Sequence, residues 1–204
     1  MLMNLPNLLT LSRILVIPAL CGAFWLPGSW SNGVPLGLFI IAGVTDWLDG
    51  HIARRYGQHS DLGRFLDPVA DKLLVSATIL MLVAFDRIAG ITVLAAIVIL
   101  CREILVAGLR EFLAELRVRL PVTKLAKWKT AVQMVAIGFL LANDSGPAWV
   151  QAPLIGHVGL WIAALVTLYT GYDYLQAALH HVTASEPAAK PVESGKIGAP
   201  SRLK

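Results

Sequence analysis

Six long apolar stretches, separated by short connections, limit what this chain can fold into. A helix needs about 20 apolar residues to cross the hydrocarbon layer of a membrane. Hydrophobic residues make up 56% of the sequence, and the mean hydropathy of +0.68 exceeds that of ordinary soluble domains. The sequence therefore predicts an all-α, polytopic membrane protein, with six transmembrane helices in one bundle. The six stretches lie near residues 8–26, 35–53, 65–85, 88–110, 126–143 and 155–178.

The bundle is expected to occupy residues 1–182, with residues 183–204 as a disordered cytoplasmic tail. This tail is rich in Ala, Pro, Ser and Lys and has no apolar period, a composition that cannot build a core. The net charge of +4 comes from basic residues near the membrane surface, and nothing in their pattern implies a nucleic acid.

The basic residues are divided unequally between the two ends of the predicted helices. The loops near 27–34 and 144–154 contain no Lys or Arg, and the turn at 86–87 contains only Arg87. Nearly all other basic residues fall on the side of the N-terminus. Because cytoplasmic loops carry the excess of Lys and Arg, both termini are expected in the cytoplasm. The protein is then expected in the cytoplasmic (inner) membrane, with its active site facing the cytoplasm.

Two pairs of carboxylates interrupt this apolar sequence. Asp46 and Asp49 are three residues apart, and Asp67 and Asp71 are four apart. If the run forms two helices joined by a bend, each pair lies on one helical face. Four acids near apolar surroundings are costly unless cations neutralise them. Oxygen ligands suit Mg²⁺, Mn²⁺ or Ca²⁺, and no His or Cys stands at a metal-binding spacing. The pattern therefore predicts a divalent metal site.

Residues of low bulk and one arginine lie between the two acid pairs. Gly50 and Ala53 each follow an acid by four residues, so the acidic face continues without side-chain bulk. Arg54 adds a forked donor suited to phosphate. Metal ions held here would clamp a phosphate and stabilise developing charge, while a carboxylate takes a proton from an attacking hydroxyl. These residues indicate metal-assisted displacement at phosphorus.

Further candidates lie in the first, fourth and fifth stretches. Thr10 caps a helix or binds a ligand, whereas Arg13 is placed to reach an anionic headgroup. Arg102 lies well inside the fourth stretch, where ionisable residues are functional or paired. Its pairing with the adjacent Glu103 is possible but awkward because adjacent helical residues diverge. Arg110 shares the arc of Arg102. Lys127 leads into the fifth stretch and is placed to face a cavity or the lipid headgroups.

The acids and small residues form the pattern D-x2-D-G-x2-A-R-x8-G-x3-D-x3-D, which resembles the signature of the CDP-alcohol phosphatidyltransferase family at every fixed position. The resemblance implies CDP-diacylglycerol as the phosphatidyl donor, CMP as the leaving group and a small alcohol as the acceptor. It makes Asp71 the general base and implies two divalent ions, Mg²⁺ or Mn²⁺. Its implied metal ligands are Asp46, Asp49, Asp67 and Asp71, and its implied CDP contacts are Asp49, Gly50, Ala53, Arg54, Ser60 and Gly63.

Three other stretches, NLPNLLTLSRILVIP, CREILVAGLREFLA and KWKTAVQM, resemble those of phosphatidylglycerophosphate synthases. This likeness implies glycerol 3-phosphate as the acceptor, and a homodimer among membrane lipids. One departure is Ala126, where such sequences often have Gly. The competing interpretations are a phosphatidylinositol-phosphate synthase, a cation transporter and a catalytically silent scaffold. The residues expected to bind the acceptor phosphate are Thr10, Arg13, Arg102, Arg110 and Lys127.

Overall fold

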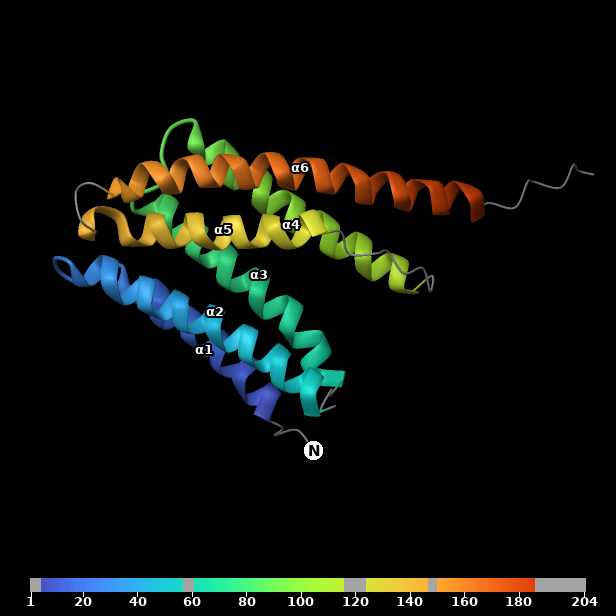
Figure 1. The fold of residues 1–204 in the computed structure, drawn as a ribbon, viewed down its shortest axis with the longest axis horizontal. Coiled ribbons are helices and arrows are strands. Elements are labelled where there is room, and N and C mark those ends of the chain that lie inside the picture. Colours follow the sequence, from blue (N-terminus) through green and yellow to red (C-terminus); the bar gives the residue numbers. More distant parts are fainter. Residues whose placement is uncertain (1–4, 57–60, 116–123, 147–149, 186–204) are drawn as a thin grey trace, which may run out of the picture.

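The computed structural model describes residues 5–56, 61–115, 124–146 and 150–185 of the chain, and within these ranges it contains no β-strand. The predicted all-α class is therefore confirmed (Figure 1). The described helices are α1 (Leu5–Ala23), α2 (Trp30–Tyr56), α3 (Asp61–Ala84), α4 (Thr92–Glu115), α5 (Lys124–Ala142), the short 3₁₀ helix η1 (Asn143–Ser145) and α6 (Ala152–Ser185).

Each α-helix corresponds to one of the apolar stretches found in the sequence. The largest difference is at α6, which continues to Ser185 instead of ending near 178, and the next largest are the start of α2 at Trp30 instead of near 35 and the end of α4 at Glu115 instead of near 110. The boundary predicted at residue 182 thus falls in the last turn of α6. The remainder of the predicted tail, 186–204, lies outside the described residues.

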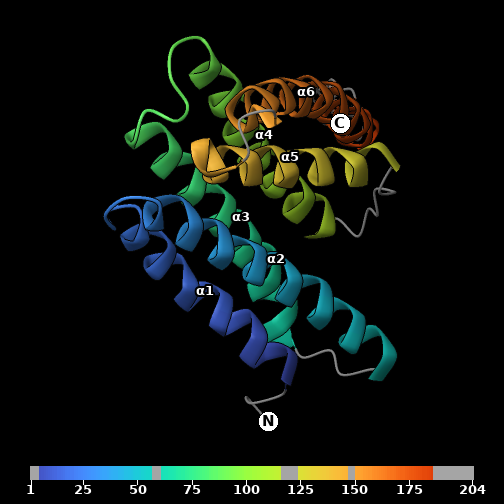
Figure 2. The ribbon, with the colours of Figure 1, turned by 60° about the vertical axis from the view of Figure 1, so that its left-hand side comes forward.

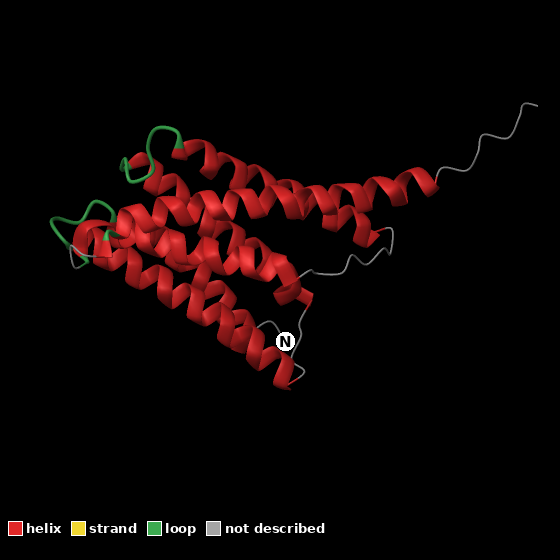
Figure 3. Ribbon diagram, turned by 45° about the horizontal axis from the view of Figure 1, so that its top comes forward, coloured by secondary structure: helices red, strands yellow, loops and turns green. Residues whose placement is uncertain are grey.

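Successive helices run in opposite directions, so three connections gather at one end of the molecule. The α1–α2 and α3–α4 connections, the end of α5 and the start of α6 lie at the left in Figure 1, and the start of α1 and the end of α6 lie further to the right. Figure 3 shows the described loops at the end opposite the N-terminus. This arrangement places the carboxylates of α2 and α3 near the end where the chain starts.

The helices form two groups. Helix α1 packs against α2 and α3, while α6 packs against α4 and α5. The groups meet near the three gathered connections, and α5 and α6 diverge from α1 and α2 towards the other end (Figures 1 and 2). Only a small part of α2 contacts α5.

Glycines allow α5 and α6 to approach closely. A Cβ atom added to Gly156 would lie 2.6 Å from Cγ of Leu140, and one added to Gly159 would lie 2.9 Å from Cβ of Ala136. Small residues at such positions let helix backbones pack in van der Waals contact, the main source of attraction between helices in lipid. The α5–α6 pair is therefore closely packed beside the candidate site.

The buried core draws on every α-helix, whereas much of the outer surface is apolar. Leu15, Ile104 and Leu165 are each more than 60% exposed, an arrangement expected where lipid replaces water. The stretches Thr92–Ala114 and Ala152–Gln176 are long and apolar enough to cross a membrane, and a shorter apolar stretch covers Thr10–Ala23. These helices suggest a membrane protein. The core includes Leu20, Phe39, Leu82, Ile99, Ile137 and Leu160.

Arg87 ties the two groups of helices together at the end away from the carboxylates. Its Nη1 donates to the carbonyl oxygen of Leu141 at 2.9 Å, and its Nη2 donates to that of Ser31 at 3.0 Å. Nearby, Asn32 Nδ2 donates to Ser145 Oγ at 2.7 Å. The one basic residue that the sequence places at this end therefore has a structural role in holding α2 against α5.

Candidate active site

Helix α1 brings two polar side chains to the carboxylates of α2 and α3. Thr10 and Arg13 are three residues apart, so they lie on one face of α1, and each is only 1% exposed. The Thr10 hydroxyl donates to Asp67 Oδ1. Nη1 of Arg13 lies 2.6 Å from Asp71 Oδ1 and 2.9 Å from Asp46 Oδ1. The predicted pairing of acids from two helices is thus present, with α1 packed behind them.

The carboxylates of Asp46 and Asp71 are partly exposed, although both contact Arg13. The side chains of Asp46 and Asp71 are 45% and 49% exposed, whereas that of Arg13 is fully buried. A buried guanidinium must be paired, and here the two carboxylates supply that pairing while their other surfaces face outward. Asp46 and Asp71 are therefore available to a ligand or to a metal ion.

The carboxylate oxygens of Asp46 and Asp71 can be compared with the ligands that a divalent metal ion requires. Asp46 and Asp71 both direct Oδ1 at a single cation, Arg13 Nη1, so carboxylates from two helices already converge on positive charge. Carboxylate oxygens are the hard ligands that Mg²⁺ and Mn²⁺ prefer. Among the described residues, no set of three or more Asp, Glu, His or Cys side chains is placed to hold an ion, and Asp49 is not among the described side chains. The chemistry of these donors fits a hard divalent ion.

Several predicted site residues have side chains that the structure does not describe. Those in α2 lie in the last three turns of the helix, which runs unbroken to Tyr56, so the predicted helical face is present in the backbone. Gly63 in α3 is buried. Ser60 falls within 57–60, outside the described residues, and Lys127 lies in the first turn of α5. The α2 residues concerned are Asp49, Gly50, Ala53 and Arg54.

An apolar cavity of about 710 Å³ lies between α2, α3 and α5, with Asp46 and Asp71 among the residues that line it. Leu36 and Ala142 also line it, and Leu36 precedes Asp46 by ten residues of α2. At about 1.5 Å per residue the cavity therefore extends roughly 15 Å along the helix. Its other lining residues include Phe39, Gly43, Leu74, Met134, Val135 and Phe139.

A second cavity of about 520 Å³ lies between α3, α4, α5 and α6 and is lined by polar residues. It shares Asp71, Val75 and Thr130 with the apolar cavity. The carboxylate of Asp71 thus stands between an apolar space and a basic one. The charged residues of the basic cavity are Asp71, Lys72, Arg102, Glu103, Arg110 and Lys129.

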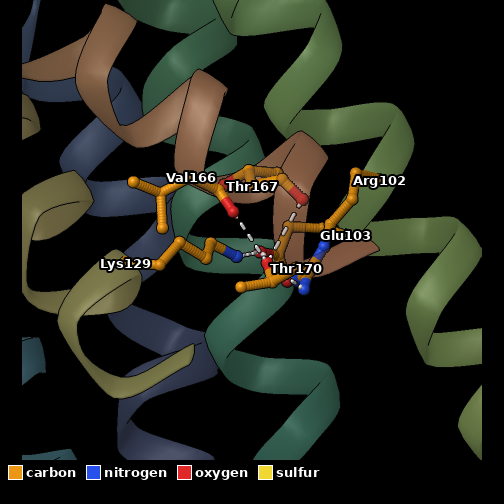
Figure 4. A network of polar contacts seen from close by, with 6 residues as sticks. All are labelled: Arg102, Glu103, Lys129, Val166, Thr167 and Thr170. Carbon is orange, nitrogen blue, oxygen red and sulfur yellow. Dashed lines mark hydrogen bonds and ion pairs between the residues drawn. The ribbon is translucent and has the colours of Figure 1, made fainter. Parts of the chain in front are cut away.

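A network of polar contacts joins α4, α5 and α6 at this basic cavity (Figure 4). Arg102 Nη2 donates to Thr170 Oγ1 at 2.9 Å, and the Thr170 hydroxyl donates to the carbonyl oxygen of Val166 at 2.9 Å. Lys129 Nζ forms an ion pair with Glu103 Oε1, which also lies 3.6 Å from Arg102 Nη1. Glu103 therefore pairs mainly with Lys129, as expected when adjacent residues diverge on a helix.

Tyr174 lies between the two arginines of α4. Its ring centroid is 5.9 Å from Arg102 Cζ and 5.8 Å from Arg110 Cζ, so both cations face the ring. Gly171 leaves room for Arg102, because an added Cβ would lie 3.1 Å from Arg102 Cγ. The predicted shared arc of Arg102 and Arg110 is therefore present and faces Tyr174 of α6, with Arg102 buried and Arg110 exposed.

The walls of the basic cavity contain buried polar atoms that have no hydrogen-bond partner. They are Nε of Arg102, Oε1 of Gln133 and the hydroxyl of Tyr174. An unpaired buried polar group costs about 1–3 kcal/mol, and native proteins contain few of them. All three atoms belong to residues that line the basic cavity, which makes these residues candidates for contact with a polar ligand.

Sequence reasoning missed part of this cavity. Lys129 and Gln133 are each only 3% exposed, and they lie four residues apart on the face of α5 that also buries Ile137 and Leu140. Their i, i+4 spacing could have indicated that both side chains share one buried face. Lys129, however, lies in a basic stretch that is equally typical of a contact with lipid headgroups. Conversely, Thr10 and Arg13, expected at the acceptor phosphate, lie against the carboxylates.

Comparison with known proteins agrees with this geometry. Residues 3–169 match the model of the CDP-alcohol phosphatidyltransferase family. A Rickettsia felis protein named CDP-diacylglycerol–glycerol-3-phosphate 3-phosphatidyltransferase is 44% identical over 174 residues, covering 85% of this chain and 94% of the relative.

Two further relatives carry the same name. The Pseudomonas fluorescens protein is 44% identical over 183 residues, covering 88% of this chain and 92% of its own. The Haemophilus influenzae protein is 41% identical over 177 residues, covering 86% and 93%. With its family model, its relatives and its carboxylate pairs in agreement, this chain belongs to the CDP-alcohol phosphatidyltransferase family.

Proposed function

We propose that this chain transfers the phosphatidyl group of CDP-diacylglycerol to glycerol 3-phosphate, giving phosphatidylglycerophosphate and CMP. The observation that carries the proposal is the position of Asp71, which lines both the apolar and the basic cavity. A reaction between a lipid and a small anion needs such a meeting point, with a group there that accepts a proton. The names of the relatives support the same pair of substrates.

The apolar cavity suits the acyl chains of the donor. It begins at Asp46 and Asp71 and continues between α2 and α5, lined almost entirely by hydrocarbon side chains. Burial of apolar surface stabilises a bound chain by about 0.8 kcal/mol per CH₂. A lipid held there places its phosphate groups beside the carboxylates, with the CDP moiety along the face of Asp49, Gly50 and Ala53.

The basic cavity suits an acceptor that carries its own phosphate. Four basic residues line it, Lys72, Arg102, Arg110 and Lys129, against the two carboxylates of Glu103 and Asp71. Charge-assisted bonds to a phosphate are worth roughly twice a neutral hydrogen bond, and a dianion at this depth requires several of them. An uncharged alcohol such as inositol, or zwitterionic serine, does not need this set.

The reaction follows from these positions. The primary hydroxyl of glycerol 3-phosphate attacks the phosphorus that bears the diacylglycerol, and the bond from that phosphorus to the CMP oxygen breaks. Asp71 takes the proton of the attacking hydroxyl. Arg13, buried beneath Asp46 and Asp71, keeps both carboxylates oriented towards the cavities. Holding both reactants beside the base supplies much of the acceleration.

Members of this family use divalent metal ions. In this chain Asp46, Asp49, Asp67 and Asp71 would hold them, and we propose two ions, Mg²⁺ or Mn²⁺. Once bound, such ions neutralise the pyrophosphate and stabilise the charge that develops on the leaving group. Thr10, which donates to Asp67, orients one of these ligands.

The proposal is tested by measuring CMP release from CDP-diacylglycerol with a panel of alcohols, with and without Mg²⁺ or Mn²⁺. We expect release with glycerol 3-phosphate and little with glycerol, serine or inositol, because only a phosphorylated acceptor uses the basic residues of the cavity. Inositol phosphate is the informative competitor: preference for it would favour a phosphatidylinositol-phosphate synthase. Absence of CMP release with every acceptor, at saturating metal, would instead favour a transporter or a silent scaffold.

We also propose that α1–α6 all cross the cytoplasmic membrane, with both termini and the carboxylates on the cytoplasmic side. Trp25 and Trp30 are 70% and 67% exposed near the α1–α2 turn, and Trp128 is 70% exposed near the start of α5. Exposed tryptophans at both ends match the aromatic belts of membrane proteins. The exposed apolar faces between these ends also offer surface for the homodimer expected from the family.

Single-cysteine labelling tests this topology. In a background with Cys21 and Cys101 replaced by Ala, a Ser29→Cys variant is expected to react with a membrane-impermeant maleimide from the periplasmic side, because exposed Ser29 lies in the α1–α2 turn. Ser201→Cys, in the predicted tail, is the matched control and is expected to react only after the membrane is opened. The reverse pattern would show that the orientation is inverted.

A further inference from the structure

Gln133 is a buried polar residue whose side-chain oxygen has no hydrogen-bond partner in the structure. It lies on α5 in the wall of the basic cavity and is 3% exposed. Its Oε1 has no hydrogen-bond partner. Gln133 follows Lys129 by one helical turn, so the two side chains share a face and lie about 6 Å apart along the axis. The amide is therefore placed one turn deeper than the lysine.

The surrounding groups define what this oxygen can bind. Lys72, Arg102 and Arg110 have only donors to offer, and the carboxylates of Glu103 and Asp71 have only acceptors. A phosphate satisfies the cations, yet it cannot satisfy Gln133 Oε1, because that atom is itself an acceptor and needs a hydrogen from its partner. The missing partner is a hydrogen-bond donor, and a hydroxyl group of the ligand supplies one while the cations of the cavity stay bonded to the phosphate.

The proposed acceptor has two hydroxyl groups with different fates. The primary hydroxyl loses its proton to Asp71 as it attacks phosphorus. The secondary hydroxyl stays intact through the reaction, and its hydrogen needs an acceptor once water has been excluded. Thr130, three residues before Gln133 on α5, lines both cavities. Gln133 therefore lies next to the place where the two cavities meet.

We propose that Gln133 Oε1 accepts a hydrogen bond from the secondary hydroxyl of the acceptor, and that Gln133 thereby selects a polyol phosphate over a simple hydroxyalkyl phosphate. This inference rests on the proposed function. Selection of this kind is strong because an analogue lacking the hydroxyl leaves a buried acceptor unpaired.

The test compares glycerol 3-phosphate with 3-hydroxypropyl phosphate, which is the same molecule without the secondary hydroxyl. For the parent protein, kcat/KM is expected to be on the order of 10- to 100-fold higher with glycerol 3-phosphate, the effect of one buried, unpaired acceptor. In Gln133→Met, which keeps the length of the side chain and removes the amide, we expect the two values to agree within about threefold. The loss should fall on glycerol 3-phosphate, because the analogue never made the bond.

Two further variants separate hydroxyl recognition from a general packing effect. Gln133→Glu keeps an acceptor oxygen but adds a negative charge near the phosphate, so we expect a higher KM for both substrates with the preference retained. Gln176→Met is the matched control, because Gln176 is exposed on α6 and bonds only Tyr172 among the described contacts. It is expected to behave as the parent.

The proposal is overturned if Gln133→Met lowers kcat/KM equally for both substrates, since a packing defect does so. It is also overturned if the parent itself uses both substrates equally well, a comparison that requires no variant to fold. Either result leaves the proposed function intact, because the parent still turns over glycerol 3-phosphate. Failure of the parent to use glycerol 3-phosphate at all would instead reject the proposed function.

Discussion

Replacing Asp71 with Asn is expected to lower kcat by about 10²-fold or more, the usual scale for loss of a general base. Asn keeps the shape of the side chain but cannot take a proton at neutral pH. Asp71 lies 2.6 Å from Arg13 and stands where the apolar and basic cavities meet. The KM for CDP-diacylglycerol should change little, because the apolar cavity and the other three acids remain. Steady-state CMP release at saturating metal measures both constants.

Asp144→Asn is the matched control for this change. Asp144 is an exposed acid in η1, at the end of the molecule opposite the carboxylates, and the same substitution there should leave kcat unaltered. A thermal unfolding scan of both variants separates loss of the base from loss of the fold. If Asp71→Asn keeps near-normal turnover, the general base is another residue.

Replacing Arg110 with Ala is expected to raise the KM for glycerol 3-phosphate by roughly 10- to 100-fold, the effect of losing a charge-assisted contact worth about 1.5–3 kcal/mol. Arg110 lines the basic cavity, yet its side chain is exposed and it packs only on the ring of Tyr174 in the described contacts. Its removal should therefore leave the fold intact. The KM for CDP-diacylglycerol should stay within about twofold of the parent value, because the donor occupies the other cavity.

Arg110→Lys is the control that keeps the positive charge but removes the forked donor geometry of the guanidinium. A lysine keeps the positive charge but lacks the planar, bidentate donor set, so its KM should fall between those of the parent and Arg110→Ala. Equal impairment of both substrates by Arg110→Ala would contradict the assignment of this cavity to the acceptor. The acceptor would then have to bind elsewhere, and of the functional conclusions only membership of the CDP-alcohol phosphatidyltransferase family would remain.

The carboxylate site was largely predictable because its information is local. Helical spacing alone places Asp67 and Asp71 on one face of a helix, and it does the same for Asp46 and Asp49. The structure confirms the two helices, α2 and α3, and the approach of Asp46 to Asp71 through Arg13. The metal ions and the roles of the CDP contacts stay predictions.

The acceptor cavity was only partly predictable because it depends on which faces of three helices meet. The shared arc of Arg102 and Arg110 could be read from their spacing, and both face Tyr174 in the structure. Nothing in the sequence pairs Lys129 with Glu103, which lies 26 residues earlier on another helix. The sequence instead predicted that Lys127 contacts the acceptor phosphate, because Lys127 leads into the fifth apolar stretch. The structure does not describe the side chain of Lys127.

The sequence by itself determined the helical class, the positions of the described α-helices apart from the seven further residues at the end of α6, and the faces that carry the acids. Each of these depends on composition and on periodicity within one segment. Only the tertiary structure decided the contacts between segments. It placed Thr10 and Arg13 beside acids 57 and 58 residues away, and it left the side-chain oxygen of Gln133 buried without a hydrogen-bond partner. The physical reason is that helical periodicity fixes the direction of a side chain around its own axis, whereas the packing of α1 on α3, and of α5 on α6, fixes what that side chain meets.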